Sequence, residues 1–214
     1  MKSFKCRADI AFLIDGSGSI VDDENCGFVN WHFVLNFLVS LAQSLQLSSQ
    51  DARVAVTQFS TVGPFNTTPL VRQEIRFSDH KRLQGFMDDV DSLITGHMNG
   101  GTPTTIGLNF SLNEMFQERY GMRRDFRKFP KTLVLMTDGE CRDGGNCSLA
   151  TFRSLKQQYK AQNIRIVGIG IGPNVNLTEM LSIVDPENYR PLSNFSDLYD
   201  VRLPLTLGLC DGML

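Results

Sequence analysis

The sequence predicts a single α/β domain built on a doubly wound, mostly parallel sheet of six strands with helices on both faces. Three observations predict it. Apolar runs alternate along the chain with segments of helical periodicity, two predicted strands are joined by a link too short for a helix, and no repeat or low-complexity linker interrupts the pattern. The 214 residues, 42% of them hydrophobic, suit one domain spanning 1–214 with its core at about 9–207.

The predicted strands come from short apolar or alternating runs. The segments 53–59 and 70–77 flank a turn rich in Pro, Thr, Asn and Gly, so they form a hairpin and give the sheet one antiparallel edge strand. The near-continuous apolar run 164–171 indicates a strand covered on both faces. The remaining predicted strands are 10–14, 132–136 and a short edge at 189–192.

The predicted helices carry apolar residues at intervals of three and four. The longest are 29–47 and 104–120, and the last helix, 195–207, ends shortly before Cys210. Shorter helices are expected at 83–93, 149–161 and 177–184.

Charge and hydropathy exclude several function classes. The net charge of −2 and the pI of about 5.9 leave no basic face for nucleic acid, and no run of Lys or Arg is longer than Arg123-Arg124. No apolar run approaches the ~20 residues of a membrane span, and no signal-peptide pattern opens the chain. We therefore expect no nucleic-acid partner and no direct membrane insertion, and we expect the chain to be part of a larger secreted or membrane-anchored protein.

The cysteines and glycosylation motifs favour an extracellular or cell-surface setting. A bridge between Cys6 and Cys210 would join chain ends that emerge at the same end of the sheet, and Cys141 and Cys147 could close a short loop. Cys26 is then left unpaired, or it exchanges roles with Cys141 or Cys147. Asn-x-Ser/Thr motifs, a sign of a secreted glycoprotein, occur at Asn66, Asn109, Asn146, Asn176 and Asn194.

Polar residues follow two of the predicted strands at the edge where ligands bind in open α/β sheets. Asp15, Ser17 and Ser19 come directly after the first strand, and the intervening glycines let the backbone turn sharply. Asp138 follows the strand 132–136, and Thr102 lies in a Gly-rich loop before a helix. Two carboxylates and three hydroxyls are oxygen ligands suited to Mg²⁺ or Mn²⁺ with a coordination position left open. The alternative is a Gly/Ser turn with Asp15 as a helix cap.

Other motif readings fail on spacing. A Ca²⁺-binding EF-hand loop starting at Asp15 would need Gly and Glu where Ile20 and Cys26 stand. The flanks of Ser17 do not form the Gly-x-Ser-x-Gly turn of hydrolases, and Thr102-Pro103 stands where a phosphate-binding loop needs Lys-Ser/Thr. No base or nucleophile accompanies the predicted metal ligands, so we expect no enzymatic activity.

With these motifs in order, the chain resembles the von Willebrand factor A domains, whose fold is Rossmann-like. It is most similar to the I domains of integrin α subunits and to the A domains of adhesins such as the thrombospondin-related anonymous protein. The resemblance rests on Asp-x-Ser-x-Ser at 15, 17 and 19, on Thr102 within Gly-Gly-Thr-Pro-Thr, and on Thr137-Asp138-Gly139. It implies a metal-ion-dependent adhesion site with Ser17, Ser19 and Thr102 as hydroxyl ligands. Asp15 and Asp138 would then act directly or through water.

The resemblance implies cell adhesion: the bound cation accepts a Glu or Asp of an extracellular protein, with collagen-like and glycan-bearing partners included. Glu140 and His97 are candidate residues at the rim of such a site. It also implies that the last helix slides when the metal changes ligands. Two alternatives are a matrix module that binds without metal and an intracellular subunit of an ATP-driven assembly.

Overall fold

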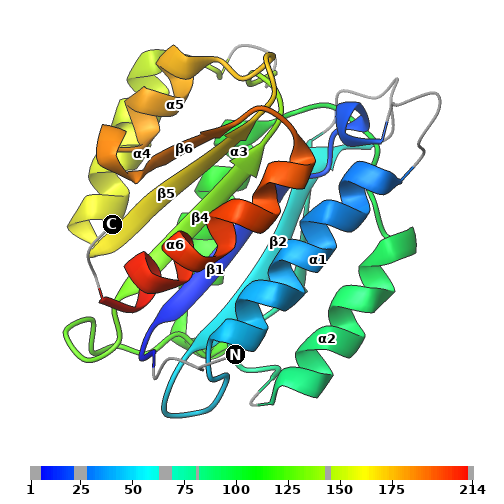
Figure 1. Ribbon diagram of the computed structural model, residues 1–214. Helices are drawn as coiled ribbons and strands as arrows, with labels where there is room; N and C mark the ends of the chain where they lie inside the picture. Colours follow the sequence, from blue (N-terminus) through cyan, green and yellow to red (C-terminus); the bar gives the residue numbers. More distant parts are fainter. Residues whose placement is uncertain (1–5, 22–27, 63–68, 81, 143–145, 212–214) are drawn as a thin grey trace.

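Six strands form one sheet in the order β3-β2-β1-β4-β5-β6. Figure 1 shows β1 in the middle of the sheet, between β2 and β4. The computed structural model describes residues 6–21, 28–62, 69–80, 82–142 and 146–211. Within them β1 lies between β2 and β4 and is parallel to both, whereas β3 is antiparallel to β2. The predicted mixed sheet is confirmed. The strands are β1 (Asp9–Asp15), β2 (Arg53–Thr61), β3 (Pro69–Ile75), β4 (Lys131–Thr137), β5 (Ile164–Ile171) and β6 (Tyr189–Leu192).

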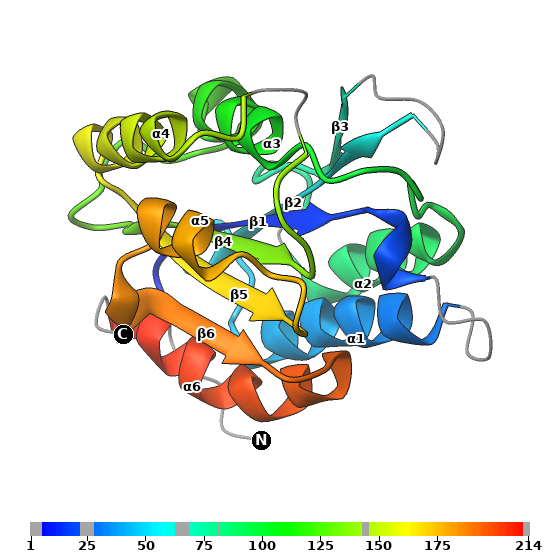
Figure 2. The ribbon, with the colours of Figure 1, turned by 90° about the horizontal axis from the view of Figure 1, so that it is seen from above.

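Helices cover the sheet on both faces (Figure 2). One face packs against α1 (Val29–Ser44), α2 (Leu83–Ser92) and α6 (Leu198–Asp211). The other packs against α3 (Thr104–Phe110), α4 (Leu149–Ala161) and α5 (Leu177–Ile183). Alternation along β1 explains the two cores, because Ile10, Phe12 and Ile14 point into the first while Ala11 and Leu13 point into the second. All seven residues of β1 are buried, as expected of a central strand.

Three predicted helices differ from those observed. The helix expected over 104–120 leaves α-helical geometry at Ser111, where a π-helical turn over Ser111–Met115 begins. The Ser111 hydroxyl donates to the Gly107 carbonyl, and the Phe116 N–H donates to the Ser111 carbonyl five residues back. At the other end of the chain α6 continues to Asp211, so Cys210 lies in its last turn rather than after it. Helix α1 stops at Ser44 because Leu45 is already extended.

Both predicted disulfides are present, and they lie at opposite ends of the sheet. Cys6, ahead of β1, is bonded to Cys210 of α6, and the two Cα atoms are 4.8 Å apart. Cys141 is bonded to Cys147 in the loop after β4. Cys26 and Asn66 lie outside the described residues. The first bridge fixes the end of α6 to the start of the central strand.

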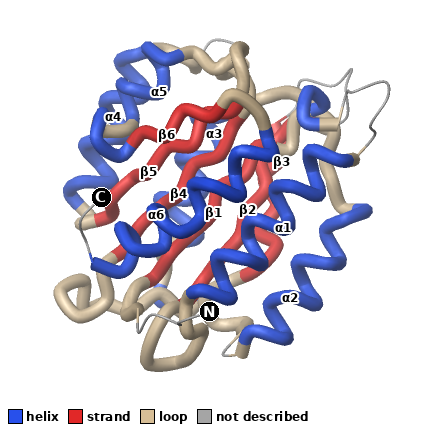
Figure 3. The backbone as a smooth tube through the Cα atoms, in the orientation of Figure 1, coloured by secondary structure: helices blue, strands red, loops and turns tan. Residues whose placement is uncertain are grey.

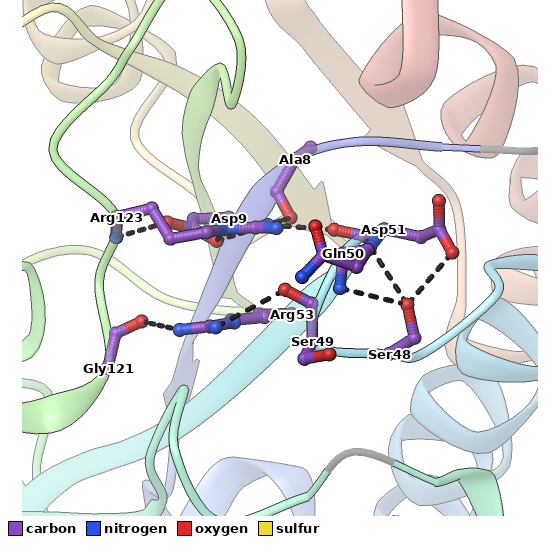
Figure 4. A network of polar contacts seen from close by, with 9 residues as sticks. All are labelled: Ala8, Asp9, Ser48, Ser49, Gln50, Asp51, Arg53, Gly121 and Arg123. Carbon is purple, nitrogen blue, oxygen red and sulfur yellow. Dashed lines mark hydrogen bonds and ion pairs between the residues drawn. The ribbon is translucent and has the colours of Figure 1, made fainter.

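A buried ion pair holds the same end of the sheet as the first disulfide. Asp9 is fully buried, and Arg123, from the loop before β4, donates to it from its backbone N–H at 2.7 Å and its Nε at 2.8 Å. The Arg123 Nη2 also donates to the carbonyls of Ala8 and Asp51 (Figure 4). Burial raises the pKa of Asp9, and the hydrogen bonds and charge of Arg123 oppose this shift. Arg123 therefore ties a long loop to the first residues of β1 and β2.

We expect Arg123→Ala to lower the free energy of unfolding by about 3–5 kcal/mol, because it removes the cation that is paired with and hydrogen-bonded to the buried Asp9 carboxylate. Arg124→Ala is the matched control: Arg124 is exposed and paired with Glu118, and its loss should leave the protein about as stable as wild type. Urea denaturation of both variants measures the difference. Equal, small losses would mean that the ion pair does not hold the loop.

Candidate functional site

Three loops meet where β1 and β4 end (Figure 3). Residues Gly16–Ser19 follow β1, residues 138–142 follow β4, and residues 98–103 lead into α3. The first and third loops are joined by a short parallel bridge between Ser17 and Gly100, in which the Gly18 N–H donates to the Gly100 carbonyl at 2.8 Å. Because β1 and β4 are adjacent and parallel, their carboxyl ends bring the first two loops to the same place.

Ser17, Ser19 and Asp138 are in direct contact. The Ser19 hydroxyl donates to Asp138 Oδ1 at 2.9 Å, the Ser17 hydroxyl donates to the same oxygen at 3.4 Å, and the two hydroxyl oxygens are 3.0 Å apart. Asp138 and Ser17 are buried, with 8% and 3% of their surface exposed, whereas Ser19 is open to solvent. Asp138 is 119 positions or more from the two serines in the sequence, and the fold brings the side-chain oxygen atoms of all three residues into one cluster.

Asp15 lies behind this cluster and is fully buried. Its Oδ1 accepts the Ser17 N–H at 2.8 Å and its Oδ2 accepts the Thr137 hydroxyl at 2.6 Å. Burial, and then the neighbouring charge of Asp138, raise the pKa of Asp15 to about 7. Burial also raises the pKa of Asp138. No Lys or Arg forms an ion pair with either carboxylate among the described residues, so two acids share an interior position without a compensating cation.

Thr102 lies across the hollow from the serines and is 6% exposed. Its carbonyl accepts the N–H of Arg142 at 2.8 Å, which joins the loop before α3 to the loop after β4. A Cβ built on Gly139 would lie 3.7 Å from the Thr102 hydroxyl oxygen, so the small residue keeps the approach to that hydroxyl open. Among the described contacts, none joins this hydroxyl to Ser17, Ser19 or Asp138.

Two side chains that the motif did not include support these loops. Gln58 of β2 is 1% exposed; its Oε1 accepts the Met98 N–H at 2.8 Å and its Nε2 donates to the Gly96 carbonyl. Thr61 accepts the Gly101 N–H at 2.6 Å through its hydroxyl. The signal available in the sequence was a long amide side chain, Gln58, inside a predicted strand.

The oxygen cluster opens into a hollow of about 950 Å³. Glu140 and Arg142 stand on its wall, both exposed, with the Arg142 Nη2 3.6 Å from the Glu140 carboxylate. Asn99 and Asn174 also line it. The hollow is therefore polar and accessible, and Glu140 stands at its edge as its position in the sequence suggested.

His97 does not stand at the rim. Its ring packs against Trp31, with centroids 4.8 Å apart, and against Phe28. Both ring nitrogens are buried and have no hydrogen-bond partner in the described structure. Burial, followed by the charge of Arg72, lowers the pKa of His97 to about 4. His97 is partly exposed beside Phe28 and Trp31 and is not among the residues that line the hollow, so its contact with a partner stays a prediction.

The donor set suits a hard divalent cation that retains waters. Two carboxylates and three hydroxyls offer only oxygen atoms, the ligand type of Mg²⁺ and Mn²⁺. The described residues hold no group of three or more His, Cys, Asp or Glu side chains placed to bind a metal, so a site here depends on the hydroxyls. The buried and uncompensated charges of Asp15 and Asp138 fit a cation at this position.

Comparison with known sequences identifies related proteins over nearly the whole chain. The sequence model of the von Willebrand factor type A domain matches residues 9–202. The collagen alpha-1(XII) chain of Notophthalmus viridescens is 29% identical over 212 residues, which are 98% of this chain and 20% of that protein. Matrilin-1 of Gallus gallus is 25% identical over 204 residues, 94% of this chain and 36% of that protein. The chain thus spans about a third or less of these relatives.

Solved structures share the fold. Proximal thread matrix protein 1 from the mussel byssus superposes with a TM-score of 0.80 at 23% identity, over 97% of this chain and 49% of that one. A further structure of that protein, described as having a zinc-occupied MIDAS motif, gives a TM-score of 0.78 at 22% identity, over 97% of this chain and 48% of that one.

These comparisons confirm the family resemblance and the fold predicted from the sequence. The collagens and matrilins are extracellular matrix proteins, so the predicted extracellular setting is confirmed as well. None of the helices in the described ranges has the length and apolar character that crossing a bilayer requires.

We expect the metal-free wild type to lose more stability than Asp15→Asn as pH rises, because the pKa of Asp15 is higher in the folded protein than in the unfolded chain. Between the ordinary value of 3.8 and about 7, the folded state keeps a proton that the unfolded chain has lost. The free energy of unfolding is therefore lower above this pH range than below it, by an amount on the order of 2–4 kcal/mol. Urea denaturation in EDTA across this pH range, with wild type and Asp15→Asn, measures the effect.

The difference between the two proteins isolates Asp15, because the lowered pKa of His97 changes stability in the opposite direction in both. Asp200→Asn, at an exposed position of α6, is the control and should follow wild type. Parallel curves for wild type and Asp15→Asn would contradict the assigned burial of this charge.

We expect Gly100→Ala to destabilise the protein by about 1–3 kcal/mol, because its Cβ would overlap the Thr61 carbonyl across the loop bridge. Gly139→Ala is the control, since its Cβ meets only the Thr102 hydroxyl at van der Waals distance. Thermal unfolding in EDTA compares them. If both variants melt with wild type, the loops are not packed as described.

Proposed function

This chain belongs to the von Willebrand factor type A domain family, and from that premise we propose that it is an adhesion domain. It binds an acidic residue of an extracellular partner protein through a divalent cation, Mg²⁺ or Mn²⁺. The residues that would hold the cation are Asp15, Ser17, Ser19, Thr102 and Asp138.

The observation that carries the proposal is the contact of Ser17 and Ser19 with Asp138, in front of the buried Asp15. Two carboxylates with raised pKa values are costly to ionise together in the interior, and a cation between the loops would remove that cost. The hydroxyl groups then supply neutral ligands. A site with few charged ligands leaves the cation able to attract a further anionic group.

When bound, the cation supplies a positive centre whose open position accepts the partner's Glu or Asp carboxylate. Ser17, Ser19 and Thr102 are proposed as hydroxyl ligands, and Asp15 and Asp138 act directly or through water. Thr137 holds Asp15 in place through its hydroxyl. Arg142, on the wall of the same hollow, would orient an acidic partner, and Glu140 would repel a misplaced one.

The comparisons support this proposal without naming a partner. The relatives are extracellular matrix proteins, and a structural neighbour is described as holding zinc in its MIDAS motif. Adhesion to matrix proteins requires binding and no chemical reaction, and we propose that the domain is not an enzyme. Collagen-like and glycan-bearing proteins are the partner classes we would test first.

We expect isothermal titration of Mg²⁺ and Mn²⁺ into the metal-free domain to give one binding event that Asp138→Ala abolishes or weakens by at least about tenfold, the effect of losing a charged ligand. Asp200→Ala, which removes an exposed carboxylate in the first turn of α6, is the control and should bind as wild type does. Unchanged binding in Asp138→Ala would contradict the assigned ligands.

Adhesion is tested separately on immobilised fibrillar collagen. We expect binding in Mg²⁺ that is lost in EDTA and in Asp138→Ala, because the partner's carboxylate needs the cation. Collagen binding that persists in EDTA would favour the alternative of a matrix module that binds without metal.

A further inference from the structure

Strand β5 has a neighbour on both sides over only half of its length. The register pairs β6 with Gly168–Ile171, whereas the preceding residues, 164–167, pair with β4 alone in the described structure. Figure 1 shows β5 running past the beginning of β6, at the end of the sheet opposite the loops that follow β1 and β4. A strand edge without a neighbour presents backbone N–H and C=O groups that an added strand can bind.

A hollow of about 420 Å³ lies along this free edge. Its floor is apolar: Ile164, Ile166 and Ile183 line it, with 4%, 6% and 1% of their surface exposed. Its walls are the last turns of α4 and the turn after α5. We call this hollow the β5 groove. An extended peptide backbone fits such a place because one side can pair with the strand while alternate side chains rest on the floor.

The β5 groove carries an excess of positive charge. Lys156, Lys160 and Arg165 line it, against the single carboxylate of Asp185. Asp185 is already paired with Lys156 at 2.7 Å. Arg165 donates only to neutral groups, the Thr132 hydroxyl and the Gly208 carbonyl, and among the described ion pairs none includes Lys160. Two cations beside the free edge therefore have no acidic partner in the part of the chain that the structure describes, which favours a negatively charged occupant.

We propose that the β5 groove is a second binding site, which takes an extended acidic peptide segment of a partner protein as a short strand added to β5. Successive residues of β5 face opposite sides of the sheet: Ile164 and Ile166 face the core under α4, and Arg165 faces the side of α6. An added strand likewise directs alternate side chains to the two sides. Apolar residues on the isoleucine side and acidic residues on the arginine side match this surface.

This site is independent of the proposed metal site. The β5 groove lies at the amino ends of the parallel strands and the oxygen cluster lies at their carboxyl ends, so the length of a strand, roughly 25 Å, separates them. Both sites can be occupied together, and binding in the β5 groove does not require a cation.

The probe is the peptide Ac-Glu-Val-Glu-Val-Glu-NH2, titrated into the whole disulfide-bonded chain in EDTA with backbone amide NMR as the readout. We expect shifts and slowed hydrogen exchange at residues 164–167. Lys160→Glu should weaken binding by about fivefold through charge reversal at an exposed position. Arg153→Glu, the same change on an exposed position of α4 outside the groove, is the matched control and should bind as wild type does.

A version of the peptide with every backbone amide N-methylated, which can donate no strand hydrogen bond from either edge, should lose binding. Equal binding of that version, or equal binding of Ac-Lys-Val-Lys-Val-Lys-NH2, would overturn the proposal. Shifts confined to Gly16–Ser19 would overturn it as well, and so would protection of residues 164–167 that depends on protein concentration without peptide, because a second copy of the chain would then be the occupant.

Discussion

The parallel pairing of β1 with β4 is the constraint on which the rest of the structure depends. Its register sets Ile14 beside Met136, so Asp15 and Asp138 leave the sheet at the same edge. The chain therefore brings two acidic side chains together inside the domain, where burial raises the pKa of both. Hydrogen bonds from Ser17, Ser19 and Thr137 reduce this cost, and a bound cation would reduce it further.

The opposite end of the sheet has a different role. There the ion pair of Asp9 with Arg123 and the disulfide of Cys6 with Cys210 join loops, helices and the first strand. Because these contacts hold one end of the sheet together, the loops after β1 and β4 at the other end can keep oxygen atoms in an arrangement that is electrostatically unfavourable without a cation. The bridge also fixes the last turn of α6 to the start of β1, which would limit any sliding of that helix.

Much of the fold could be predicted from the sequence because its signals are local. Each strand is a short apolar or alternating run, and the short link between 53–59 and 70–77 required the antiparallel edge that β3 forms. The π-helical turn at Ser111 could not be predicted, because the apolar spacing continues through it and only the hydroxyl contact with Gly107 marks the change. The extension of α6 to Asp211 likewise depends on packing rather than on periodicity.

For the candidate site, spacing in the sequence predicted which residues gather but not what supports them. Asp15, Ser17, Ser19 and Asp138 converge because strand ends and tight turns fix them. Gln58 was missed because its role lies in contacts with Gly96 and Met98, distant in the sequence. The surroundings of His97 could not be predicted for a related reason: only the fold shows that its ring packs against Trp31.

The most direct test of the central claim is anomalous X-ray diffraction from crystals of the domain grown with Mn²⁺. The account predicts one strong anomalous peak bounded by oxygen atoms of Ser17 and Ser19, with Thr102, Asp15 and Asp138 around it. Crystals saturated with Mn²⁺ that show no peak between these loops, or a peak held by other residues, would contradict it.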